Sequence, residues 1–143
     1  MRRFVLLAVL FGLAAPALAQ EHYNEGPVWR VTYYNVKPGK FNETLADLRA
    51  NFGKVMAAAK AQGVVQDYKV FLNSTSDSAD DWDIATATLY KGYGGMDGLA
   101  AKMDAITLLH YGTADARRAA GEKRDQLRDV VMSKLAREIT LKP

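Results

Sequence analysis

The spacing of apolar residues changes from a strand-like to a helical pattern across four residues, and this change restricts the folds that the chain can adopt. Residues 28–36, VWRVTYYNV, are rich in β-branched and aromatic side chains, which is typical of a strand. After the turn residues 37–40, KPGK, apolar side chains recur at helical spacing along residues 41–62. Gly63 follows where a left-handed C-terminal cap is expected. A strand that runs directly into an amphipathic helix predicts a domain in which helices pack on a sheet.

The rest of the chain predicts three further strands and two further helices. The polar, acidic segment 73–81 is expected to be a hairpin loop, and the glycine-rich segment 92–95 a hinge. Thr113 stands where the N-cap of the last helix is expected. The predicted strands are 64–72, 82–90 and 138–141, and the predicted helices are 98–110 and 114–135. The last helix is expected to place Leu127, Val130, Val131 and Leu135 on one side.

This order of elements predicts the α+β class. With right-handed crossovers it gives a four-stranded antiparallel sheet with helices on one face, in a ferredoxin-like β-α-β-β-α-β arrangement with an extra C-terminal helix. The strand that runs through residues 37–40 into a helix, and the later strand 84–90 followed by a glycine break and a helix, resemble the dimeric α/β-barrel superfamily of ferredoxin-like proteins. That group includes small antibiotic-biosynthesis-type monooxygenases and related uncharacterised secreted proteins. The resemblance covers most of residues 28–141.

Both faces of the predicted first strand carry apolar side chains. Trp29, Val31 and Tyr33 share one face, and the opposite face carries Val28, Tyr34 and Val36. A sheet covered by helices on one side only is expected to have one polar face. The second face is therefore expected to meet another surface, and the resemblance implies a second copy of the chain, which gives a homodimer. The alternative is a ligand pocket lined by these side chains.

The first residues predict export. Arg2 and Arg3 precede an apolar run over residues 4–13, and Ala17-Leu18-Ala19 has the small-x-small pattern that signal peptidase cuts. We expect residues 1–19 to be a cleaved signal peptide of the bacterial Sec type, residues 20–27 a flexible lead-in, and residues 28–143 a single domain. The protein is then periplasmic or secreted.

Composition narrows the function classes. The chain contains no cysteine and two histidines, so thiolate or multi-histidine metal centres and cysteine nucleophiles are not expected, nor is a lipid anchor on a cysteine. Removing Arg2 and Arg3 from the 19 basic residues leaves them nearly balanced against 16 acidic ones, which does not favour nucleic acid or an anionic membrane. We expect no metal, cofactor or membrane anchor.

Charged and aromatic residues inside the predicted strands are the candidate site residues. Arg30 and Asp83 are candidates for a pair that binds or polarises a small polar ligand, although wet strand ends also accommodate such charges. His110 has the intrinsic pKa of a general base, and it equally suits a helix C-terminus, where the dipole favours it. The candidate ligand-binding residues are Arg30, Tyr34, Trp82 and Tyr90.

Three functions are compatible with the sequence. The first is an exported binding or accessory protein that holds a small apolar or aromatic molecule. The second, implied by the resemblance, is a cofactor-free oxygenase or isomerase, with His110, Asp83 or a tyrosine as base and Arg30 stabilising negative charge. The third is a protein-interaction module. An enzyme should bring Arg30, Asp83 and His110 to one cavity, whereas an interaction module should have an exposed apolar face without a cavity.

Overall fold

The computed structural model describes residues 22–75, 77–78 and 80–143, so the predicted signal peptide lies outside the described residues. The strands are β1 (Tyr23–Val36), β2 (Asp67–Leu72), β3 (Ile84–Tyr90) and β4 (Arg128–Leu141). The helices are α1 (Phe41–Asp47), the π-helical turn η1 (Leu48–Phe52), α2 (Gly53–Ala61), the 3-10 turn η2 (Tyr93–Met96), α3 (Leu99–Tyr111) and α4 (Ala114–Asp125).

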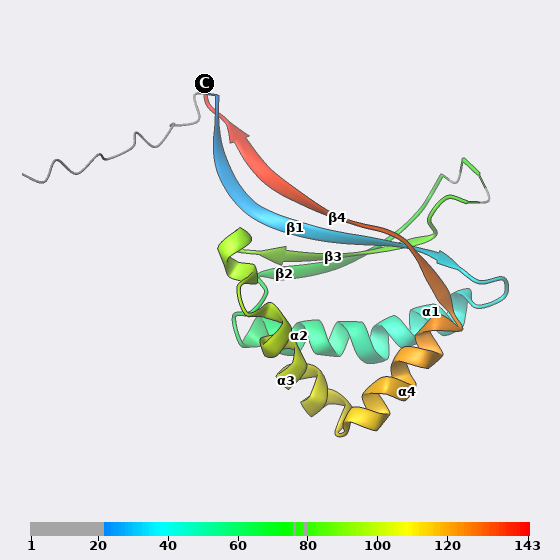
Figure 1. Ribbon diagram of the computed structural model, residues 1–143. Helices are drawn as coiled ribbons and strands as arrows, with labels where there is room; N and C mark the ends of the chain where they lie inside the picture. Colours follow the sequence, from blue (N-terminus) through cyan, green and yellow to red (C-terminus); the bar gives the residue numbers. More distant parts are fainter. Residues whose placement is uncertain (1–21, 76, 79) are drawn as a thin grey trace, which may run out of the picture.

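The four strands form one antiparallel sheet in the order β2-β3-β1-β4. All α-helices lie on the same side of this sheet (Figure 1). Central strands β1 and β3 with crossover helices on one face make up the ferredoxin-like arrangement, so the predicted α+β fold is confirmed. Strand β2 is an edge strand, as its charged residues Asp67 and Lys69 suggest.

The predicted first helix is one helical segment made of α1, η1 and α2 without a break. Gly39 and Gly63, on either side of it, have positive φ of 74° and 69°, the backbone region that glycine enters without steric cost. The apolar stripe of α2 packs on α3 and on the end of β3. The buried residues of this core are Val55, Met56, Ala59, Val65, Tyr90 and Ile106.

The prediction of a helix over 114–135 is wrong in its second half. Helix α4 ends at Asp125, and the segment from Arg128 onward is the 14-residue strand β4, so the predicted short strand 138–141 is only its last part. Strand β4 pairs with β1 along almost its whole length, from Arg128 opposite Val36 to Leu141 opposite Tyr23. These long-range backbone hydrogen bonds outweigh the helical spacing of the apolar residues in 127–135.

Strand β1 is also longer than predicted. It begins at Tyr23, so residues 23–27 of the expected lead-in belong to the sheet. The register between β1 and β4 shifts between Glu25 and Val28. Gly26 lies in this bulge, where a Cβ would approach the carbonyl oxygen of Glu138 to 2.9 Å. A glycine is therefore needed for the two strands to pass so closely.

A buried ion pair joins the first helix to the start of β4. An Arg128 Nη1 atom lies 3.1 Å from Asp47 Oδ2, and the side chains are 7% and 6% exposed. Asn51 donates from Nδ2 to Asp47 Oδ1 at 2.7 Å, one helical turn further on. The guanidinium of Arg128 also lies over the ring of Tyr34, 4.8 Å from its centroid. The contact connects helix, strand and sheet at one end of the domain.

Candidate ligand-binding site

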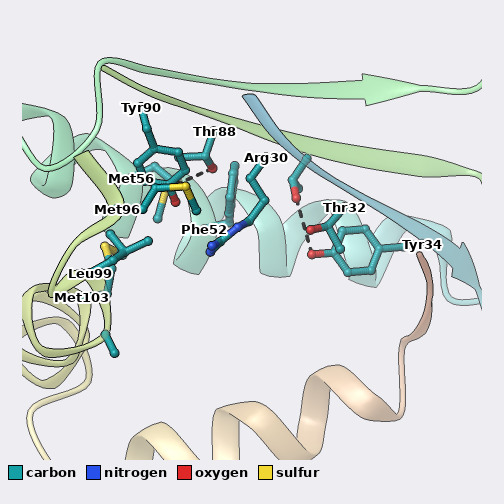
Figure 2. Close-up of a pocket in the computed structure, with 12 residues that line it drawn as sticks. Arg30, Thr32, Tyr34, Phe52, Met56, Thr88, Tyr90, Met96, Leu99 and Met103 are labelled. Carbon is teal, nitrogen blue, oxygen red and sulfur yellow. Dashed lines mark hydrogen bonds between the residues drawn. The ribbon is translucent and has the colours of Figure 1, made fainter. Parts of the chain in front are cut away.

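A cavity of about 500 Å³ lies between the sheet and the helices. Figure 2 shows its lining side chains converging from β1 and β3 above and from the helical layer below. The lining residues are Arg30, Thr32, Tyr34, Phe52, Met56, Thr86, Thr88, Tyr90, Met96, Leu99, Ala100 and Met103. Its volume is in the range that binds small organic molecules.

The sheet side of the cavity is polar, which is unusual for a face covered by helices. Alternation directs Arg30, Thr32 and Tyr34 of β1 to this face. Strand β3 adds Thr86, Thr88 and Tyr90. Thr86 lies opposite Thr32 and Thr88 opposite Arg30, and Tyr90 follows two residues further along the same face of β3. Six neighbouring side chains thus present a guanidinium and five hydroxyl groups to the cavity. A core that served stability alone would place aliphatic side chains here.

Among the residues that the structure describes, Arg30 carries the only full charge on the wall of this cavity. In the described part of the chain no carboxylate forms an ion pair with it; its guanidinium lies 5.6 Å from the ring centroid of Tyr90. Burial raises the pKa of Tyr90, and the nearby Arg30 charge opposes that rise. Tyr90 therefore remains a neutral phenol at physiological pH, and the cation of Arg30 is available to an anionic ligand group.

The hydroxyl groups of the cavity have capacity for further hydrogen bonds. The phenol oxygen of Tyr34 lies 3.4 Å from Thr86 Oγ1, a long contact in which either group donates. Thr88 donates from Oγ1 to the sulfur of Met56 at 3.8 Å, and a thioether is a weak acceptor. Since each hydroxyl offers one donor and two acceptor sites, these groups can bind a polar ligand atom.

The helical side of the cavity is apolar and adaptable. Phe52 and Met56 come from the first helical segment, Met96 from η2, and Leu99 and Met103 from the start of α3. Three of these five residues are methionine, whose unbranched side chain adjusts to ligands of different shape. A molecule in the cavity would therefore lie with an apolar body under the helices and a polar group against the sheet.

Three of the four predicted ligand-binding residues meet in this cavity: Arg30, Tyr34 and Tyr90. The structure places Trp82 elsewhere. It precedes the first residue of β3, and its ring packs edge-on against Tyr33, at 5.3 Å between centroids. Strand alternation predicts the side of a residue only while the strand continues, and β3 begins at Ile84.

The structure does not bring Asp83 and His110 to Arg30. The Asp83 carboxylate accepts the backbone N–H of Val36 at 2.7 Å and so closes the end of the sheet. His110 lies near the C-terminus of α3, where its Nε2 is 3.0 Å from Asn51 Oδ1. Neither residue lines the cavity that contains Arg30.

Other lining residues were not predicted as site residues. The threonines Thr32, Thr86 and Thr88 share an alternation with the predicted residues, so strand periodicity was a usable signal for them. The helical contributors Phe52, Met56 and Met103 look like ordinary core residues in the sequence. Only the packing of their helices against the sheet shows that they face a cavity.

No group of three or more histidine, cysteine or acidic side chains is arranged to hold a metal ion in residues 22–75, 77–78 and 80–143. Over the same ranges, the helices are all too short or too polar to cross a membrane.

Comparisons with known proteins add a structural likeness. No protein-family model matches the chain, and no curated protein matches it. The chain is similar to a crystal structure of a dimeric protein of unknown function and ferredoxin-like fold from Bacteroides fragilis. The two are 17% identical, the match covers 82% of this chain and 97% of that chain, and the TM-score is 0.42. The sheet order β2-β3-β1-β4 of the chain itself shows the ferredoxin-like fold.

Proposed function

We propose that the protein binds a small amphipathic molecule with an apolar or aromatic body and an acidic group. The observation that carries this proposal is the polar face that β1 and β3 present to the cavity, which includes Arg30. No acidic residue lies on the cavity wall among those that the structure describes. Arg30 is half-buried, and partial burial of a cation without an acidic partner is unfavourable, so a carboxylate beside Arg30 would stabilise both groups. The methionine-rich helical side would hold the apolar part of the molecule.

The same cavity favours binding over catalysis. An oxygenase or isomerase of the kind considered above needs a base that accepts a proton near neutral pH. The ionisable groups on the cavity wall are one arginine and two tyrosines. Burial raises the pKa of Tyr90, which makes its phenolate still less accessible. We therefore favour a binding or accessory role without turnover.

Binding of matched probes tests this proposal. Isothermal titration of the purified protein should show that phenylacetate and octanoate bind. The amides phenylacetamide and octanamide, which lack the charge, should bind with lower affinity. Arg30→Gln should weaken carboxylate binding by about tenfold or more, because a charge-assisted hydrogen bond contributes roughly 1.5–3 kcal/mol. Arg118→Gln is the matched control, since Arg118 lies on the exposed side of α4. Equal affinity of acid and amide, or of Arg30→Gln and Arg118→Gln, would contradict the proposal.

We also propose that the protein is a homodimer joined through the face of the sheet opposite the helices. This open face carries Trp29, Val31, Phe71 and Ala87, which line a shallow hollow together with Lys69 and Glu138. Phe71 is 46% exposed. Lys69 lies over the ring of Trp29, and the indole of Trp29 donates to Glu138. A face with an apolar centre and charges of both signs is complementary to a second copy of itself.

Native mass spectrometry tests the homodimer. The unmodified protein should appear as a dimer and Phe71→Glu as a monomer, because the substitution places a charge in the apolar centre of the interface. Leu109→Glu, which changes an 81% exposed residue on α3, is the control and should stay dimeric. A monomeric wild type, or a dimeric Phe71→Glu variant, would refute this interface.

The mass of the periplasmic protein also tests export, since cleavage after Ala19 leaves a chain that starts at Gln20.

A further inference from the structure

A second cavity of about 270 Å³ lies next to the first. The two share the wall formed by Tyr34, Phe52, Met56 and Met103, all labelled in Figure 2. A molecule that extends past these side chains would pass from one cavity into the other. The rest of the second cavity is lined by residues of a more polar character from the first helical segment, α3, α4 and the start of β4. They are Asp47, Asn51, Val55, Thr107, Tyr111, Arg117, Arg124 and Arg128.

The side of helix α4 that packs against the rest of the domain carries arginines. Four of its residues are partly buried and the others are exposed, namely Arg117, Ala120, Gly121 and Arg124. They are spaced i, i+3, i+4 and i+7, which is the stripe that faces the core in an amphipathic helix. In an ordinary surface helix this stripe is apolar. Here its two long side chains, Arg117 and Arg124, are cations that line the second cavity.

The three arginines of this cavity differ in how their charge is balanced. Arg128 is paired with the buried Asp47, and Arg117 is paired with Asp104 at 2.7 Å. Arg124 donates to the phenol oxygen of Tyr111 at 2.9 Å, and among the described residues it has no acidic partner. Arg124 is therefore the cation in this cavity whose charge the protein itself does not neutralise.

We propose that the second cavity binds an acidic group through Arg124, with Tyr111 holding the guanidinium in place. This deepens the proposed function and rests on it: Arg30 binds one acidic group, Arg124 a second, and the shared wall of Phe52, Met56 and Met103 contacts an apolar spacer between them. The ligand class is therefore an apolar or aromatic molecule with an acidic group at each end.

Octanoate and suberate test this proposal, because they have the same chain length and differ in one terminal carboxylate. Isothermal titration should show that suberate binds at least about tenfold more tightly than octanoate. Arg124→Gln should remove this preference and leave octanoate affinity unchanged, whereas Arg30→Gln should weaken both probes. Arg124→Lys, which keeps the charge, should retain part of the preference. Arg118→Gln on the outer side of α4 should behave as wild type, and circular dichroism should show that all variants are folded.

The outcomes separate the two proposals. If octanoate binds through Arg30 while suberate binds no better, or if Arg124→Gln keeps the preference for suberate, the second acidic subsite is refuted and the proposed function stands. If neither probe binds at any concentration that the titration reaches, both proposals are refuted for straight-chain acids. Both proposals are supported if the suberate preference is lost in Arg124→Gln and persists in Arg118→Gln, and if Arg30→Gln weakens the binding of both probes.

Discussion

Replacing Asp47 with asparagine removes the negative charge of the ion pair that joins the first helix to β4. The two side chains are 6% and 7% exposed, so neither Asp47 nor Arg128 regains hydration in the folded protein. Removing one partner of a buried pair costs about 3–5 kcal/mol, because the other charge stays buried and unpaired. The contact at 3.1 Å has no hydrogen-bond geometry between Asp47 Oδ2 and Arg128 Nη1, which places the expected loss near the lower end of this range.

Urea unfolding, followed by circular dichroism at fixed protein concentration, measures this loss. For Asp47→Asn we expect a free energy of unfolding lower by about 3 kcal/mol, and a melting temperature lower by on the order of 10 °C. The hydrogen bond from Asn51 can persist, because asparagine retains an acceptor oxygen. The effect therefore reports the lost charge.

An exposed ion pair of the same chemistry is the control. Asp115 and Arg118 of α4 are 83% and 71% exposed at 3.0 Å, so Asp115→Asn should cost less than about 1 kcal/mol. The double variant Asp47→Leu with Arg128→Leu should recover most of the stability, since it leaves no unpaired charge. If Asp47→Asn costs no more than Asp115→Asn, the reasoning from burial is wrong.

Two further predictions concern α4 and the cavity. Thr113→Ala should lower the free energy of unfolding by about 1 kcal/mol, because the Thr113 hydroxyl accepts the N–H of Ala116 at 3.0 Å and caps α4; Thr113→Ser should restore the value in the same urea titration. Burial raises the pKa of Tyr90, so at alkaline pH the folded state keeps the phenol proton that the unfolded chain releases. The contribution of this proton to stability is therefore complete below pH about 10 and is lost as the pH rises through the pKa of the folded state. The free energy of unfolding should therefore fall less steeply with rising alkaline pH for Tyr90→Phe than for wild type. Equal slopes would show that the pKa of Tyr90 is not raised.

Short-range features of the fold were predictable from the sequence. The turn before the first helix and the glycine after it were recognised, and Gly63 has the positive φ that ends a helix. Helix α3 was predicted over 98–110 and is found over Leu99–Tyr111, with Gly112 after it. Thr113 caps α4 as expected. Each of these depends on interactions between residues a few positions apart, which the sequence records directly.

The candidate site was only partly predictable. Arg30, Tyr34 and Tyr90 stand out in the sequence as charged or aromatic residues inside predicted strands, and the structure places all three on the wall of the cavity. Alternation could not place Trp82, which lies beyond the end of β3. The helical side of the cavity depends on how the helices cross the sheet, and apolar residues on a helix read the same whether they fill a core or line a cavity.

The sequence alone determined which segments are helical near their capping residues and turns, and that a strand-helix pattern would give an antiparallel sheet with helices on one face. Only the tertiary structure decided that the segment after α4 is a 14-residue strand, since its apolar spacing suits a helix and its extended form is stabilised by hydrogen bonds to β1, about a hundred residues earlier in the chain. The tertiary structure alone also turned Arg124 toward a cavity. Contacts between distant segments determine both the extended conformation of β4 and the orientation of Arg124. The energies of such contacts cannot be read from any local window of the sequence.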